Sequence, residues 1–436
     1  MSKILIFLLV IIPIYFIVKK FLRPRDFSRT FTYVLAFIGL SLTVSMVFFP
    51  EDAFEAAVKG LDIWWNIVFP ALLPFFIGSE ILMGLGVVHF MGILLEPLMR
   101  PIFKVPGVGS FVMAMGLASG FPIGSILTTR MRKEKLVTRI EGERLMSFTN
   151  TADPLFMFGA VAVGMFGLPH VGVSIAAAHY LSSISVGLIM RFHGKDKKAA
   201  PEAKAKKNIV LRGLEALVSA REKDKRPLGQ LMGDAIRNSV NTLLLIGGFI
   251  ILFSVIIRIL DVLGFVAVLS SFLSIVMGPL GIDTGLSPAI ISGFFEVTLG
   301  CQLAGGAPEA IPMYQKIMIA GSVIAWSGLS VHAQVASIIS ETDMRITPFV
   351  CARAIHAVLA GVYTYLLFGP LSFVINRITV PVFLYTTPRA GDFSFWWQRT
   401  AFATQRVLTV ILILMAVSLL MYAATEVRGA FRRKSL

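Results

Sequence analysis

Long apolar runs separated by short polar stretches make up most of this 436-residue chain. Many of them reach the length of about 20 residues that an α-helix needs to cross a bilayer. The pattern therefore predicts an all-α, polytopic membrane protein. The predicted apolar helices are residues 4–18, 31–50, 63–86, 107–129, 143–167, 171–192, 242–260, 286–303, 317–340, 350–371 and 407–422, and amphipathic stretches at 87–104 and 265–280 favour helices lying in the membrane interface.

Two runs in the first half are interrupted by residues that helices avoid. The sequence SGFPIG occupies positions 119–124, and FTNTADP occupies positions 148–154. Bilayer hydrocarbon offers unpaired backbone groups no water, so irregular backbone survives there only where it is buried in protein or lines a cavity. Both interruptions are therefore predicted walls of a binding site.

The same kind of interruption recurs in the second half of the chain. The triplet SGF returns at 292–294, and Pro106 and Pro279 are separated by the same number of residues as the two triplets. A second interruption, AWSGLS at 325–330, follows this triplet, just as FTNTADP follows the triplet SGF of the first half. Matched helix interruptions in two halves of a chain are typical of transporters that bind substrate near the bilayer midplane.

The repeat divides the chain into five parts. These are N-terminal membrane spans at 1–60, a first repeat at 61–192, a cytoplasmic linker with one helix around 209–220 at 193–236, a second repeat at 237–375, and a loop, last span and basic tail at 376–436. The alternating charges of the linker are typical of a solvated connector.

Topology follows from half-helix length and from the distribution of basic residues. Each half of 143–167 has about ten residues, too few to cross alone, so this segment and 317–340 are predicted to be re-entrant. With about nine crossings, the linker and the tail lie in the cytoplasm and the repeats are inverted. The basic stretch 130–144, expected to form one amphipathic helix, then lies outside, against the positive-inside rule. If 143–167 and 317–340 were full crossings, residues 130–144 would lie in the cytoplasm, but residues 19–29 and the C-terminal tail would lie outside.

Composition narrows the class of function. Hydrophobic residues make up 56% of the chain and charged residues 15%, with a net charge of +15. The basic residues cluster beside apolar runs, which indicates topology signals and anionic lipid headgroups rather than nucleic acid. Cys301 and Cys351 both fall in predicted membrane segments, so neither a disulfide framework nor a CxxC metal site is expected. No HExxH, GxSxG, Walker A or GxGxxG motif supports catalysis, ATP coupling or a cofactor.

Three motifs carry a resemblance to a known family. GLASGFPIGS at 116–125, EGERLMSF at 141–148 and TNTADPLFMFGAV at 149–161 resemble the nucleoside-recognition, or Gate-domain, membrane proteins of spore-forming bacteria. The resemblance covers roughly residues 60–375 and is greatest to two-copy sporulation members. It implies a transporter of dipicolinate, the pyridine dicarboxylate stored in spores, in the outer forespore membrane of a bacterial cell. The second copy departs from the motif, with Phe295-Glu296 in place of Pro122-Ile123, so a related substrate stays open.

Broken helices suggest how a dicarboxylate would bind. A break exposes backbone N–H groups and the positive end of a helix dipole, which suits an anion, and inverted repeats supply two such ends. Small residues at the breaks could instead serve close helix packing, and a lone histidine is commonly a packed one. The predicted substrate-binding residues are Ser119, Gly120, Gly124, Asn150 and Thr151 in the first copy, and Ser292, Gly293, Ser327, Gly328, Ser330 and His332 in the second.

Two carboxylates lie inside the breaks and are predicted to couple transport to an ion. An ionisable group within the membrane is costly, so it is a functional hypothesis by default. Asp153 precedes a proline and could simply cap a half-helix. Glu296 shows no such alternative in the sequence, apart from a buried structural pairing with Arg258 or Lys316.

The leading hypothesis is a secondary transporter for a small aromatic dianion. The alternatives are a nucleoside- or ion-translocating relative, a non-transporting scaffold in spore envelope assembly, and an intramembrane enzyme. A scaffold has no need of paired polar breaks, and an enzyme should show a nucleophile and a base. The expected partners are the substrate and the lipid bilayer, without nucleic acid, and a homo-oligomer stays open.

Overall fold

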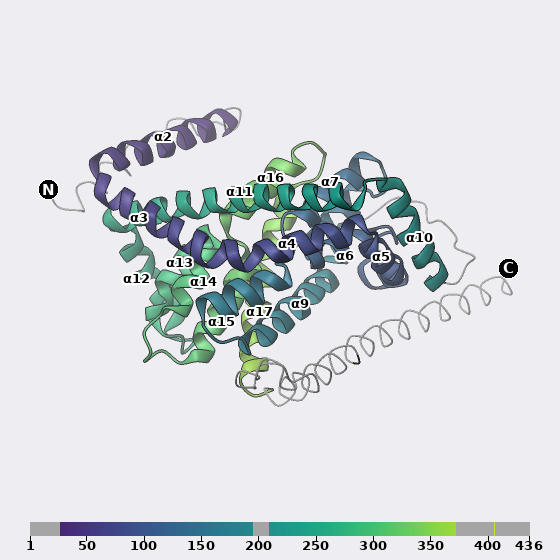
Figure 1. The fold of residues 1–436 in the computed structure, drawn as a ribbon. Helices are drawn as coiled ribbons and strands as arrows, with labels where there is room; N and C mark the ends of the chain where they lie inside the picture. Colours follow the sequence, from purple (N-terminus) through teal and green to yellow (C-terminus); the bar gives the residue numbers. More distant parts are fainter. Residues whose placement is uncertain (1–26, 195–208, 372–404, 406–436) are drawn as a thin grey trace, which may run out of the picture.

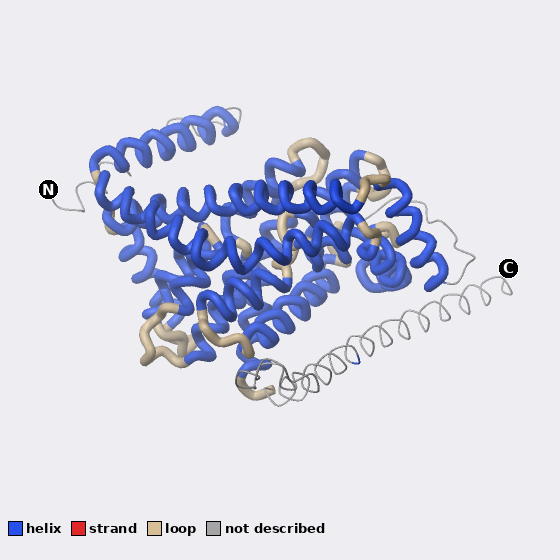
Figure 2. Tube along the Cα trace, in the orientation of Figure 1, coloured by secondary structure: helices blue, strands red, loops and turns tan. Residues whose placement is uncertain are grey.

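The computed structural model describes residues 27–194, 209–371 and Gln405. Helices and loops alone make up this part of the chain (Figure 2), which confirms the all-α class. The predicted spans at 4–18 and 407–422, most of the 19–29 loop and the basic tail lie outside the described residues.

The first repeat begins after a sharp bend. Helix α2 (Phe27–Phe48) meets the following helix at 102°. The elements that follow are α3 (Pro50–Ile63), η1 (Trp64–Val68), α4 (Phe69–Gly84), α5 (Val87–Leu98), η2 (Met99–Phe103), α6 (Gly109–Ser119), α7 (Ile123–Lys133), α8 (Arg139–Thr149), η3 (Phe156–Met165) and α9 (Val171–Met190). Here η1, η2 and η3 are π-helical segments.

The second repeat presents the same order of elements. After the connector α10 (Ile209–Asp224), these are α11 (Leu228–Val262), α12 (Phe265–Met277), the short η4 (Thr284–Leu286), α13 (Ser287–Phe295), α14 (Val297–Gly305), α15 (Met313–Trp326), α16 (Gly328–Ile339) and α17 (Ile346–Phe368). In both halves a glycine with positive φ, Gly86 at 82° and Gly264 at 85°, lets the chain turn out of the long helix. Helix α11 begins at Leu228, within the stretch 193–236 that was predicted as the linker.

Helices α6 and α7 form a hairpin, as do α13 and α14. A Cβ added at Gly116 or Gly124 would lie 1.9 or 2.6 Å from the carbonyl oxygen of Thr149, so both legs of the first hairpin flank one backbone segment. In the second hairpin, a Cβ on Gly300 would lie 2.3 Å from the Cα of Gly293. These contacts require glycine, since any side chain would separate the helices.

The hairpins correct the expected form of two segments. Residues 107–129 and 286–303 were predicted to be broken spans, whereas each folds back on itself at its interruption. Sequence signals show that a helix stops, but the direction in which the next helix leaves depends on tertiary contacts.

The segment predicted to be re-entrant at 143–167 does not fold back on itself. It comprises α8 and η3, which lie antiparallel to α9 along their whole length. Ser183 donates to the Phe148 carbonyl at 2.6 Å, and His179 Nε2 accepts from the Ala152 N–H at 3.0 Å. Two half-helices stacked end to end reach the length that neither has alone, which is why counting each half singly was misleading.

The second interrupted segment behaves in the same way. Helices α15 and α16 together, Met313–Ile339, form one 27-residue candidate span, so the re-entrant prediction for 317–340 was also wrong. Within the described residues, α9, α11 and α17 are also long and apolar enough to cross, and the bent α2–α3 pair would add one more span.

A cluster of charged residues joins several chain segments at one face of the protein. The Arg144 guanidinium donates to the carbonyls of His193, at 2.8 Å, and Lys104, at 3.1 Å. The buried Glu143 carboxylate accepts from Arg345 at 3.0 Å and from His193 at 2.6 Å. The start of α8, the end of α9 and the start of α17 therefore lie on the same side of the membrane.

This arrangement corrects the expectation for the basic stretch 130–144. It lies on the same side as the linker, and the positive-inside rule then assigns both to the cytoplasm. Nor is it one helix, because α7 ends at Lys133 and α8 starts afresh at Arg139. Thr138 and Glu141 form a capping box there, the usual signature of a helix start.

The second hairpin opens toward the opposite face. A Cβ on Gly305, at the end of α14, would lie 2.6 Å from the carbonyl of Met165, where η3 ends. Near the start of α15, Gln315 accepts from the Asp283 N–H at 2.7 Å. One hairpin thus enters from the cytoplasmic face and the other from the far face, which confirms the predicted inverted repeats.

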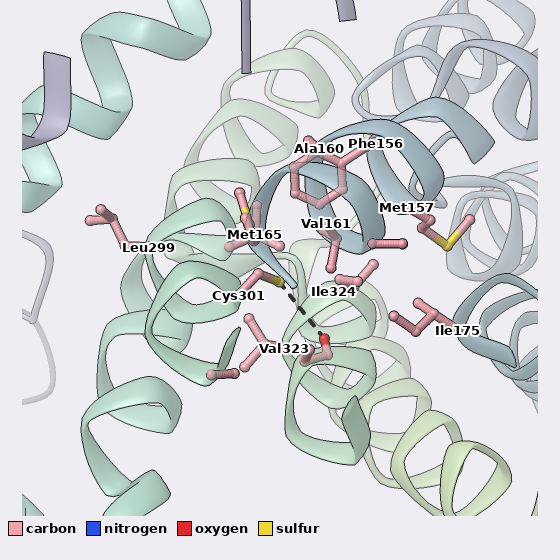
Figure 3. Packing of buried hydrophobic residues seen from close by; sticks show 14 of the residues in the cluster. Phe156, Met157, Ala160, Val161, Met165, Ile175, Leu299, Cys301, Val323 and Ile324 are labelled. Carbon is pink, nitrogen blue, oxygen red and sulfur yellow. Dashed lines mark hydrogen bonds between the residues drawn. The ribbon is translucent and has the colours of Figure 1, made fainter. Parts of the chain in front are cut away.

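Helix α11 runs antiparallel to the continuous α3–α4 helix (Figure 1). Arg258 pairs with Asp52 at 2.7 Å near one end, and Leu231 packs onto Gly84 at the other. The main apolar core lies where η3, α9, α14 and α15 meet, around Val161 and Ile324 (Figure 3).

We predict that Glu134→Cys, between α7 and α8, and Lys223→Cys, at the end of α10, are labelled by a membrane-impermeant maleimide from the same, cytoplasmic side. Glu309→Cys, between α14 and α15, should be labelled only from the other side. All three positions are exposed, and a Cys351→Ser background removes the exposed native thiol.

Labelling of Glu134→Cys and Lys223→Cys from opposite sides would restore the re-entrant model for 143–167. The unsubstituted background protein serves as the control for residual reaction at buried Cys301.

Candidate functional site

The tip of the first hairpin touches the first broken helix. Gly120 has φ 73°, and a Cβ there would lie 2.9 Å from Asp153 Oδ2. The Asp153 carboxylate accepts from the N–H groups of Leu155, at 2.9 Å, and Phe156, at 2.8 Å. Asp153 is therefore a cap at the start of a half-helix. Its part in ion coupling stays a prediction.

The second copy repeats this contact. Gly328 has φ 73°, and a Cβ there would lie 2.9 Å from the carbonyl of Phe295 and 3.1 Å from Cα of Glu296. The Glu296 carboxylate accepts from the Leu299 N–H at 2.8 Å and caps α14. The view that Glu296 has no capping alternative was wrong, because a new helix starts immediately after it.

Neither basic residue suggested as a partner of Glu296 contacts it. Arg258 pairs with Asp52 and Asp261, and Lys316 donates to the Ala307 carbonyl at 2.7 Å. The Glu296 side chain is thus held by backbone donors within its own hairpin.

The buried guanidinium of Arg353 joins the two breaks. This residue of α17 is 0% exposed, and its Nη1 donates to the carbonyls of Asn150, at 2.8 Å, and Ala325, at 3.5 Å. Its Nη2 donates to the Ser147 carbonyl. These carbonyls end α8 and α15, where helix carbonyls lack partners and the dipole is negative. One cation therefore satisfies a half-helix end from each repeat.

Two histidines pack beside Arg353. The rings of His179 and His356 lie 4.6 Å apart, and His356 Nε2 donates to the His179 carbonyl at 3.0 Å. His179 in turn accepts from the Ala152 N–H inside the first break. Both side chains thus position the interrupted backbone.

Two half-helices start in this region without a side-chain cap among the described residues. They are α7 of the first repeat and α16 of the second, which pack against each other. Three buried groups nearby also lack a described hydrogen-bond partner: both amide atoms of Asn150, the Ser125 hydroxyl and His332 Nε2. Unpaired buried polar groups are rare and each costs about 1–3 kcal/mol. The arrangement therefore offers donors to a ligand.

An aromatic stack borders the second break. The Trp326 ring is stacked on Phe294, with centroids 5.4 Å apart and planes at 11°, and its Nε1 donates to the Phe294 carbonyl at 3.0 Å. The His332 ring lies 4.4 Å from Trp326. Phe294 is 45% exposed, so part of the stack remains uncovered.

The remaining predicted substrate-binding residues of the first hairpin touch the interrupted backbone, whereas Gly293 packs against a side chain. Gly124 lies against the backbone of Asn150, and Ser119 ends α6 beside the tip. Thr151 donates to the Gly116 carbonyl at 3.2 Å. Gly293 is covered by Val323, which favours its packing role.

In the second copy, two serines begin α16 and one lies apart. Ser327, with φ 71°, and Ser330 are buried at the start of the helix. Ser292 instead lines a cavity on the non-cytoplasmic half of the protein.

Sequence reasoning missed Arg353, Phe294 and Trp326. An arginine inside the apolar run at 350–371 is itself a signal, because ionisable residues are rare in membrane segments. The aromatic pair carries no such signal, since aromatic residues are common in apolar helices. Its stacking depends on the hairpin meeting the broken helix.

The fold and the site define a polytopic membrane protein of two inverted repeats, in which a hairpin tip meets a broken crossing helix in each repeat. The chain belongs to the Gate family, described as "Nucleoside recognition", whose model matches residues 66–180 and 243–345. It is 48% identical over 350 residues to the sporulation integral membrane protein YlbJ of Bacillus subtilis (strain 168), covering 79% of this chain and 85% of that protein. The resemblance drawn from the three motifs is thereby confirmed, and the chain is an integral membrane protein.

More distant similarities were also found. An uncharacterised protein of Alkalihalophilus pseudofirmus is 28% identical over 177 residues, 39% of this chain and 36% of that protein. A solved structure, CNTnw in an inward-facing substrate-bound state, aligns at 15% identity and a TM-score of 0.43, covering 85% of this chain and 90% of that one. Likeness at this level carries no argument about the site.

We predict that Arg353→Met lowers the free energy of unfolding by about 3 kcal/mol, because the carbonyls that end two half-helices lose a buried charged donor. Thermal and denaturant unfolding of the purified protein in detergent would measure the change. Arg258→Met is the matched control, since its ion pairs are half-exposed and worth about 1 kcal/mol or less. Equal effects of the two substitutions would show that Arg353 does not hold the breaks together.

Proposed function

We propose that this chain is a secondary transporter of a small aromatic dicarboxylate, specifically dipicolinate, in the outer forespore membrane during sporulation. Among the described residues, two half-helix starts have no side-chain cap, α7 and α16, and the nearby Asn150 side chain has no hydrogen-bond partner. This observation carries the proposal. One of these helices belongs to each inverted repeat. The name of the relative YlbJ supports the link to sporulation.

Charge favours a dianion at this place. Each helix start carries a positive dipole end, and two such ends match two carboxylates. The opposing negative ends of α8 and α15 are neutralised by Arg353. The Ser125 hydroxyl and the Asn150 amide add hydrogen-bond donors for a carboxylate or a pyridine nitrogen.

Ring stacking favours an aromatic substrate over an aliphatic one. The Phe294–Trp326 stack lies at the second break, and Phe294 is 45% exposed. Aromatic pairs contribute about 0.5–1.5 kcal/mol beyond the burial of their area. A planar pyridine ring would gain this contribution, whereas a flexible dicarboxylate would not.

A nucleoside is the second candidate, because the matching family is described as nucleoside recognition. Its base could stack on the same aromatic face. It is uncharged, however, and would leave both positive helix ends without a counter-charge. A dianion therefore uses more of the features at the site.

The coupling of transport to a proton or cation is assigned to Glu296, with Asp153 as its counterpart in the first repeat. Both carboxylates are buried, 4% and 6% exposed, and neither pairs with a basic side chain in the part of the chain that the structure describes. A charge buried in this way is costly, and binding a proton or cation removes the cost. Neutralisation would also remove repulsion between the carboxylate and an anionic substrate.

We predict that Asn150→Ala reduces dipicolinate uptake into proteoliposomes about tenfold without lowering the amount of folded protein, because its amide has no described protein partner to lose. Ser327→Ala should also weaken uptake. Asn238→Ala, on α11, is the control. Normal uptake by both site variants would show that the breaks are packing features. Binding of a labelled nucleoside, but not of labelled dipicolinate, would favour the second candidate.

We predict that Glu296→Gln retains dipicolinate binding but loses the dependence of uptake on a proton or cation gradient, because glutamine stays neutral at every stage. Binding would be measured at equilibrium, and uptake with and without an imposed gradient. Glu309→Gln, on an exposed loop, is the control. Undiminished accumulation driven by a gradient in Glu296→Gln would remove the coupling role.

A further inference from the structure

A cavity of about 460 Å³ opens on the non-cytoplasmic half of the protein, between α3, α11, α12 and the second hairpin. Its mouth carries Glu55 and Lys59 of α3 and Arg258 and Asp261 of α11. Two acidic and two basic side chains line this end, and Asp52 pairs with Arg258 at 2.7 Å. The mouth therefore carries no excess of positive charge that would repel a proton.

The floor of the cavity is bonded directly to Glu296. Ser292, which lines the cavity, accepts the Glu296 N–H at its carbonyl at 2.8 Å. Leu299, another lining residue, donates its N–H to the Glu296 carboxylate at 2.8 Å. Glu296, 4% exposed, therefore lies immediately behind this floor.

Polar groups in the wall suit water. The Ser254 hydroxyl and Gln302 Oε1 are buried and have no hydrogen-bond partner among the described residues. Buried polar atoms without a protein partner are ordinarily satisfied by water, and a water molecule takes about 30 Å³. At about 460 Å³ the cavity has room for several waters.

We propose that this cavity is the path along which protons from the non-cytoplasmic side reach the Glu296 carboxylate; this inference rests on the proposed function. A hydronium ion at the mouth gives up a proton, which passes along the waters. An O–H bond forms on Glu296, one water remains at the mouth, and the carboxylate becomes neutral.

Few other titratable groups lie on the elements packed against this hairpin. Helix α11 carries Arg258 and Asp261, and toward its start Asp234 and Arg237. Helix α15 carries Tyr314 and Lys316, and α16 carries His332. Lys316 and His332 are already bonded to backbone carbonyls. Cys301 of α14 is buried and donates to the Ala320 carbonyl. Helix α12 and η3 carry no titratable side chain. Glu296 is thus the carboxyl group that the path serves.

The test uses Gln302→Cys in a Cys351→Ser background, reconstituted and treated from the non-cytoplasmic side with a membrane-impermeant methanethiosulfonate. We expect modification, verified by mass, to slow dipicolinate uptake driven by a proton gradient about tenfold. Dipicolinate counterflow at constant acidic pH should stay within twofold, since exchange needs no net proton entry. The background protein should be unaffected, because Cys301 is buried.

Gln302→Leu removes the polar side chain without any reagent, and it should slow gradient-driven uptake while leaving counterflow nearly unchanged. Gln302→Asn keeps a side-chain amide and should retain gradient-driven uptake. Three results would overturn the path: no modification from the non-cytoplasmic side, an equal loss of counterflow and gradient-driven uptake, or uptake driven by sodium alone. Absence of dipicolinate counterflow in the unsubstituted protein would instead overturn the proposed function.

Discussion

Backbone carbonyls that end a helix inside a membrane must find a donor within the protein, because the surrounding hydrocarbon offers none. Arg353 meets this constraint for two broken helices at once, donating to Asn150 and Ser147 at the end of α8 and to Ala325 at the end of α15. The interaction brings together the interruptions of two repeats that the chain separates widely.

Glycine makes the hairpin tips fit against those breaks. Gly116 and Gly124 admit the Thr149 carbonyl at distances that a side chain would forbid, and Gly328 does the same for Phe295. Close packing and ligand binding are therefore not opposing accounts of the small residues. Some of them bring backbones together, and the resulting contact leaves the Asn150 side chain buried without a described protein partner.

Inversion gives the two halves complementary roles. Each repeat contributes one capped half-helix start, at Asp153 or Glu296, and one uncapped start, at α7 or α16. In the proposed function, the capped starts hold the carboxylates that bind a proton or cation, and the uncapped starts offer positive dipole ends to an anion. The proposed substrate site and the proposed coupling site would then both derive from one duplicated arrangement.

The sequence determined by itself the helical membrane class, the two interrupted segments in each half and the family, because apolar length and helix-breaking residues act locally. It could not determine which interruption turns back and which continues across the membrane. Both kinds contain glycine or proline, and only the packing of α8 and η3 along α9 selects a crossing. The roles of Arg353 and of the Trp326–Phe294 stack likewise depended on tertiary structure, because their partners lie in segments that are distant along the chain and meet only after folding.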